Sequence, residues 1–156
     1  MKTKLILLIL VFVTARFVSA AMDQVYDERA DARKDIRAAI AQASHTGQPA
    51  KHIAVIFGAN WCFDCRMLEA QMHRGDLAQL IEKNYVVVKI DVGRMDKNID
   101  FASIYDVPIK NGIPAVAILD ARGKLLFAQD QGQFADARHI SSESIRAFFE
   151  QWKPRN

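Results

Sequence analysis

Short apolar runs alternate with longer amphipathic stretches along most of this chain. Residues 53–57 form a continuous apolar run of strand length, which is typical of a strand buried on both faces. Residues 85–90 and 115–119 are two further predicted strands. Residues 120–123 have the composition of a turn, and 124–129 would complete a hairpin with the run before it. The pattern therefore predicts four strands, of which the last closes a hairpin.

Between these runs, apolar residues recur at three-, four- or seven-residue spacing, which predicts helices with one buried face. Gly47 and Pro49 would end the first of them, and a charged loop would precede the fourth. The expected helices are 23–44, 62–72, a short helix capped by Asp76, a brief helix ending near Tyr105, and a last helix capped by Ser141 or Ser142.

The predicted order of elements is α-β-α-β-α-β-β-α, with a βαβ unit first and a β-hairpin followed by a helix last. A βαβ unit makes parallel strands and a hairpin makes antiparallel ones, so we expect an α/β fold with a mixed central sheet and helices on both faces. The chain has 156 residues, 51% of them apolar and 25% charged, as in ordinary globular proteins. We expect one domain after the N-terminal segment.

Residues 1–20 have the three-part layout of a secretory signal peptide. Lys2 and Lys4 precede an apolar run over 5–13, and small residues follow at 19–21. The run is shorter than the about 20 apolar residues that cross a bilayer. We therefore expect cleavage after residue 20 or 21 and a mature domain over 21–156, the alternative being an uncleaved membrane anchor.

The net charge of the chain depends on that segment. The chain has 21 basic and 18 acidic residues, and the segment holds three of the basic ones, Lys2, Lys4 and Arg16, and no acid. The mature chain is therefore close to neutral, which gives no support for binding to nucleic acid or to an anionic membrane.

The two cysteines of the chain, Cys62 and Cys65, stand where the first apolar run gives way to helical spacing. The unpaired N–H groups at a helix N-terminus favour a thiolate, which is the species that attacks disulfides. Cys62 is thus the candidate nucleophile, and Cys65, one turn later, the residue that resolves a mixed disulfide.

Three other interpretations of this pair are a structural disulfide, a zinc site and covalent haem attachment. A stabilising disulfide across so short a loop would gain only about 2 kcal/mol. A zinc site lacks a second cysteine pair, and the four histidines show no paired ligand spacing. Covalent haem attachment would need a histidine after Cys65, where Arg66 stands.

Two motifs resemble those of the thioredoxin superfamily: Ala-Asn-Trp-Cys-Phe-Asp-Cys over 59–65, and Gly-Ile-Pro over 112–114. The resemblance covers nearly all of the mature chain. It implies a thioredoxin fold in which Pro114 is the cis-proline beside the disulfide and Ile113 pairs with the substrate backbone. It also implies that Trp61 flanks the active sulfur and contributes to substrate binding, the alternative for Trp61 being core packing.

The sequence departs from the best-known pattern of this family in several places. Phe63 and Asp64 separate the cysteines, and Asp64 is either a charge that disfavours thiolate or a solvated helix acid with little effect. The family has a buried acid that helps to deprotonate the second cysteine, and Ile56 stands at that position here. Glu69 and Lys89 are the candidate substitutes for this acid, the alternative for each being a solvated surface charge. Extra residues over 108–111 would extend a loop near the site.

Together these features predict an exported, periplasmic-type thiol-disulfide oxidoreductase that acts on protein disulfides, with reduction slightly favoured over oxidation or isomerisation. We expect no metal and no organic cofactor, no transmembrane span in the mature chain, and a membrane or soluble partner that transfers electrons. The alternative is a non-catalytic module that binds a partner around Trp61 and Pro114.

Overall fold

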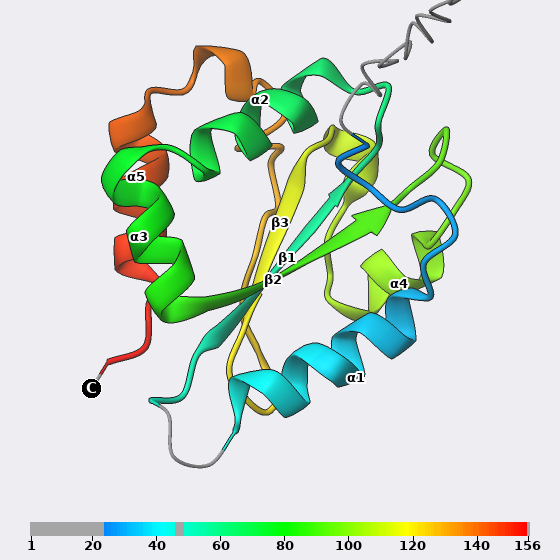
Figure 1. Ribbon diagram of the computed structural model, residues 1–156. Coiled ribbons are helices and arrows are strands. Elements are labelled where there is room, and N and C mark those ends of the chain that lie inside the picture. The colour runs from blue at the N-terminus through cyan, green and yellow to red at the C-terminus, as the bar shows by residue number, and fades with distance from the viewer. Residues whose placement is uncertain (1–23, 46–48, 156) are drawn as a thin grey trace, which may run out of the picture.

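The computed structural model describes residues 24–45 and 49–155, which fold around a four-stranded sheet of order β2-β1-β3-β4 (Figure 1). The central strand β1 pairs parallel with β2 and antiparallel with β3, which in turn pairs antiparallel with β4. The sheet is therefore mixed, as expected. The strands are β1 (His52–Gly58), β2 (Tyr85–Asp91), β3 (Ala115–Leu119) and β4 (Leu125–Ala128).

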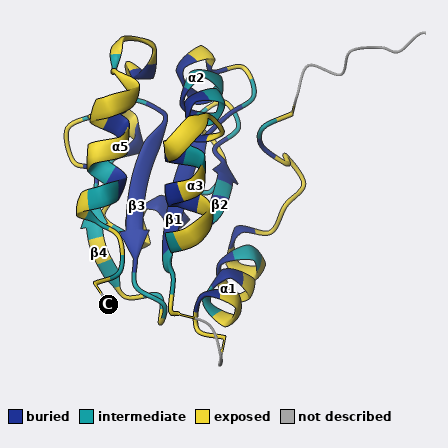
Figure 2. Ribbon diagram, turned by 60° about the vertical axis from the view of Figure 1, so that its left-hand side comes forward, coloured by how far each residue is buried: buried dark blue, intermediate teal, exposed yellow. Residues whose placement is uncertain are grey.

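Helices cover both faces of the sheet, and the buried strands lie between them (Figure 2). One face carries α1 (Ala32–Ala43) and α4 (Ile99–Ile104), and the other carries α2 (Phe63–Met72), α3 (Gly75–Asn84) and α5 (Ser142–Gln151). Two short 3-10 helices, η1 (Ile109–Asn111) and η2 (Ala137–His139), lie in the loops before β3 and α5.

Strand β1 is buried on both faces because its side chains alternate between two apolar clusters. Val55 and Phe57 pack with α1 and α4, whereas Ala54 and Ile56 pack with α2, α3 and α5. Successive residues of a strand point to opposite faces, so a continuous apolar run serves both layers. The end of this strand is thereby fixed from both sides, and the cysteine motif begins there.

The structure corrects two expected helix boundaries. The first helix begins at Ala32 rather than at residue 23, because Asp31 caps it by accepting hydrogen bonds from the N–H groups of Arg33 and Lys34. Helix α3 begins at Gly75, so Asp76 lies in its first turn and is not its cap. Ser141 caps α5 as expected, accepting from the N–H of Ser144.

Within the described residues, no helix is long and apolar enough to span a bilayer. The expected signal peptide, residues 1–20, lies outside the part of the chain that the structure describes.

Candidate functional site

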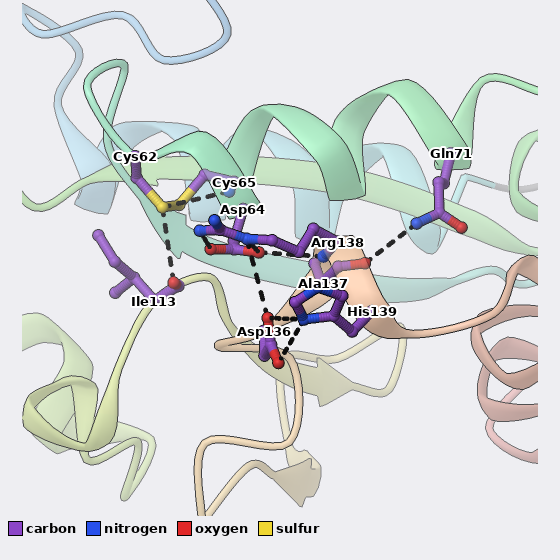
Figure 3. Close-up of polar contacts among 9 residues, drawn as sticks. All are labelled: Cys62, Asp64, Cys65, Gln71, Ile113, Asp136, Ala137, Arg138 and His139. Atoms are coloured by element: carbon purple, nitrogen blue, oxygen red, sulfur yellow. Dashed lines mark hydrogen bonds and ion pairs between the residues drawn. A yellow bond between two sulfur atoms is a disulfide. The ribbon is translucent and has the colours of Figure 1, made fainter.

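Cys62 and Cys65 lie at the carboxyl end of β1 and form a disulfide, with Cα atoms 5.3 Å apart (Figure 3). Cys62 is the N-cap of α2, and its sulfur accepts a hydrogen bond of 3.1 Å from the N–H of Cys65. The same N–H is placed to stabilise a thiolate on Cys62 after reduction. Both residues are buried, Cys65 more so than Cys62.

The second motif lies directly against this disulfide. The carbonyl oxygen of Ile113 is 3.5 Å from the sulfur of Cys62, and the peptide bond between Ile113 and Pro114 is cis. The fold thus brings together two motifs that are 51 residues apart in the sequence.

Trp61 and Phe63 flank the disulfide with exposed rings, 52% and 48% accessible. The indole N–H of Trp61 donates a hydrogen bond of 2.7 Å to the carbonyl of Gly93, and the guanidinium of Arg94 lies 5.7 Å from the ring centre. Core packing is therefore excluded as the role of Trp61. Large exposed aromatic rings beside a reactive group are suited to contact a protein partner.

Both expectations for Asp64 are wrong: it is not an unbalanced charge that disfavours thiolate, and it is not a solvated helix acid. It is buried, and its carboxylate accepts hydrogen bonds of 3.0 Å from both the backbone N–H and the Nε–H of Arg138. The Nη2 group of Arg138 bonds the second carboxylate oxygen. These bonds to Arg138 outweigh the burial and hold the pKa of Asp64 below its usual value.

Arg138 belongs to η2, which lies along α2 (Figure 3). Its guanidinium also lies 4.9 Å from the ring centre of Phe63, so one side chain contacts both residues between the cysteines. At the far end of α2, the amide of Gln71 donates to the carbonyl of Ala137. Sequence reasoning missed Arg138, because 74 residues separate it from Asp64 and no local pattern marks it.

Glu69 and Lys89, the considered substitutes for a buried acid, form an ion pair with each other. Glu69 also lies 2.9 Å from Nε2 of His73. The side chains of Glu69 and Lys89 are both partly buried rather than fully solvated. The structure thus brings the two residues together one turn of α2 beyond Cys65, with the carboxylate engaged by cationic or polar neighbours.

Tyr26 is a second residue that sequence reasoning missed. It is 1% exposed, and the side chain of Asn60 accepts from its N–H and donates to its carbonyl, each at 2.9 Å. Asn60 belongs to the cysteine motif, so the segment before α1 is tied to the site. Nothing in the local sequence marks Tyr26, since its partners are more than 30 residues away.

Within the described ranges 24–45 and 49–155, no group of three or more His, Cys, Asp or Glu side chains is placed to hold a metal ion.

Comparisons with known proteins agree with this geometry. A disulphide isomerase from Xylella fastidiosa Temecula1 is 39% identical, with 84% of this chain and 98% of that one covered and a TM-score of 0.77. The oxidised C-terminal domain of DsbD from Neisseria meningitidis is 20% identical over 80% of this chain and 97% of that one, with a TM-score of 0.53, which shows a shared fold.

The sequence matches none of the curated proteins. The family model described as thioredoxin-like matches residues 31–121, which include the cysteine pair, Ile113 and Pro114. With a mixed four-stranded sheet, helices on both faces and a disulfide at the end of the central strand, the chain belongs to the thioredoxin-like family.

Proposed function

We propose that this protein is an exported thiol-disulfide oxidoreductase that exchanges disulfides with proteins of the cell envelope. The observation that carries this proposal is the placement of the Cys62 sulfur. It accepts the Cys65 N–H at the start of α2 and lies beside the Ile113 carbonyl, at a surface formed by Trp61 and Phe63.

In the reductive direction, the thiolate of Cys62 attacks one sulfur of a substrate disulfide. A bond forms between Cys62 and that sulfur, the substrate disulfide breaks, and the other substrate sulfur leaves as a thiolate. Cys65 then loses its proton to water and attacks Cys62, which releases the second substrate thiolate. The protein ends with the disulfide seen here, and two electrons have passed to the substrate.

We favour reduction slightly, because no histidine lies between the cysteines to stabilise a thiolate. Asp64 adds less to this argument than expected, since Arg138 balances its charge. Isomerisation is the second candidate, supported by the name of the 39% identical Xylella protein. The exchange itself needs no metal or organic cofactor, and continued reduction requires an electron donor, in the membrane or soluble, outside this chain.

The substrate surface comprises Trp61, Ile113 and Pro114, where an extended segment can lie across the disulfide and pair with the backbone of Ile113. Phe63 extends the same exposed surface. Export through residues 1–20 would deliver the protein to the periplasm, where disulfides persist.

The proposal is tested by trapping. In Cys65→Ser, the mixed disulfide on Cys62 cannot be resolved, so covalent complexes with envelope proteins should accumulate on non-reducing gels and disappear with dithiothreitol. Cys62→Ser is the matched control, and it should trap little, because the remaining cysteine, Cys65, is only 1% exposed in the wild-type structure. Purified wild-type protein should also reduce insulin, and reactivation of scrambled ribonuclease would reveal isomerase activity.

Equal trapping by both variants would refute the assigned roles. A wild-type protein that neither exchanges with insulin or scrambled ribonuclease nor yields trapped complexes would instead support the non-catalytic binding module.

A further inference from the structure

The hydroxyl of Tyr26 and the buried sulfur of Cys65 both lie next to Gly58 at the end of β1. Because Gly58 has no side chain, the two groups can approach the same place: a Cβ atom added at Gly58 would overlap the Tyr26 hydroxyl and lie 2.9 Å from the Cys65 sulfur. The hydroxyl and the sulfur therefore face the same point. Asn60 fixes this arrangement by holding the Tyr26 backbone at both its N–H and its carbonyl.

The surroundings of Tyr26 keep its hydroxyl protonated. Burial raises the pKa of Tyr26 well above its ordinary value, and the nearby carboxylates of Glu69 and Asp91 raise it further. A phenol in this state donates a hydrogen bond and does not act as a base. The titratable and charged groups on the elements around Tyr26 and Cys65 include Asp27, Glu28 and Arg29 from its own segment, Asp64, Arg66, Glu69 and His73 from α2 and its C-cap, Lys89 and Asp91 from β2, and Lys97 from the following loop.

A hydrogen-bond donor beside Cys65 would favour its ionisation, for which the sequence offers no acid at position 56. Cys65 must become a thiolate to resolve a mixed disulfide, and burial by itself disfavours the charged form. Ile56 supplies no acid, and the carboxylate of Glu69 is already engaged by Lys89 and His73. A hydrogen bond to the charged form of a group favours that form.

We propose that Tyr26 donates a hydrogen bond to the sulfur of Cys65 when the disulfide opens, and so favours the thiolate that attacks Cys62. This inference rests on the proposed function for its biological meaning. Tyr26 keeps its own proton throughout, and the proton of Cys65 passes to water. The new bond joins Cys65 to Cys62 as the bond from Cys62 to the substrate breaks.

The test is a direct titration of Cys65, which requires no exchange activity. In a Cys62→Ser background, thiolate formation is followed by ultraviolet absorbance against pH, with Cys62→Ser/Cys65→Ser as the baseline for each variant. Adding Tyr26→Phe should raise the pKa of Cys65 by about one unit, which is about a tenfold loss of thiolate at any pH well below it. This substitution leaves all the surrounding charges in place.

Tyr85→Phe is the matched control. Tyr85 is also buried, but its hydroxyl donates a hydrogen bond of 2.7 Å to the carbonyl of Phe149 at the other end of β2. Removing this hydroxyl should lower stability without changing the pKa of Cys65. If the role of Tyr26 were purely structural, Tyr26→Phe would likewise lower stability and leave the pKa of Cys65 unchanged. An unchanged Cys65 pKa in a folded Tyr26→Phe protein would therefore overturn the proposal.

Gly58→Ala covers the case in which Tyr26→Phe does not fold. The new β carbon must displace the Tyr26 hydroxyl, so it should also raise the pKa of Cys65, and an unchanged value there would equally overturn the proposal. Failure of the proposed function would appear separately, as a wild-type protein that does not exchange disulfides although Cys65 titrates as expected.

Discussion

At the scale of single residues, the charge balance between the cysteines depends on one ion pair. Asp64 is the carboxylate and Arg138 its partner. Asp64→Asn leaves a positive guanidinium near the sulfurs, which favours thiolate and the reduced form, so the reduction potential should become less negative. Arg138→Gln leaves a buried carboxylate and should shift the potential the opposite way. We expect changes of about 30 mV, or about 1.4 kcal/mol, in titrations against glutathione.

The double variant Asp64→Asn/Arg138→Gln should return close to the wild-type potential, because neither charge remains. Arg146→Gln serves as the control, since Arg146 pairs with Glu150 on α5. Shifts of Asp64→Asn and Arg138→Gln in the same direction would show that the pair acts through packing rather than charge. A wild-type potential above about −160 mV, closer to the about −120 mV of DsbA than to the about −270 mV of thioredoxin, would contradict the preference for reduction.

Residues of the site differed in how far the sequence could predict them. Cys62, Cys65, Trp61 and Ile113 lie in short motifs, and the structure places all four at the disulfide. The balance of charge at Asp64 could not be predicted, because its partner lies 74 residues away. An arginine among 21 basic residues carries no local sign that it is bound to a buried acid.

At the scale of elements, Asp64 connects α2 to η2, and this connection should depend on pH. The pKa of Asp64 is lowered in the folded protein, chiefly by its hydrogen bonds to Arg138. The stabilisation is therefore complete above the unfolded value of about 3.9 and is lost as pH falls through the lower folded value. Near neutral pH, Asp64→Asn should lower the free energy of unfolding by about 1.5–3 kcal/mol, and the difference from wild type should shrink in acid.

The measurement is denaturant unfolding of the oxidised proteins across this pH range. Asp136→Asn is the control. Asp136 is exposed and comes no closer than 3.8 Å to a nitrogen of Arg138, so its effect on stability should be small. A difference between wild type and Asp64→Asn that persists unchanged at the lowest pH would contradict an ionic origin.

Elements were predicted well where one pattern dominated and less well at their ends. The strands are short apolar runs, and all four form. The first helix was predicted too long because Val25 fits its spacing and does pack against the core, although the segment that carries it is not helical. Capping by Asp31 sets the start of α1. The start of α3 is harder to predict, because the residue before it, Arg74, makes no capping hydrogen bond with its side chain.

At the scale of the whole molecule, the predicted mixed sheet with helices on both faces is confirmed, because each βαβ or hairpin unit allows few arrangements. The order of elements differs from the predicted one in that two helices, α2 and α3, lie between β1 and β2. Export remains a prediction. The full-length chain expressed with its leader should be recovered from the periplasm with residues 1–20 or 1–21 removed, as intact mass and N-terminal sequencing would show. Deletion of 2–20 should retain the protein inside the cell.

Recovery of the uncleaved chain in membranes would instead identify the segment as an anchor. The periplasmic fraction should also contain the complexes trapped by Cys65→Ser, because the proposed substrates are envelope proteins.

The attachment of Tyr26 to Asn60 also bears on how the protein should be handled. Because this contact holds the start of the described chain close to the disulfide, a fusion joined shortly before residue 24 would be tethered near the cysteine motif. The described chain ends beyond α5, toward the opposite end of the sheet (Figure 1). An affinity tag for purification or substrate capture is better joined on the α5 side of the molecule, where it leaves the approach to Cys62 open.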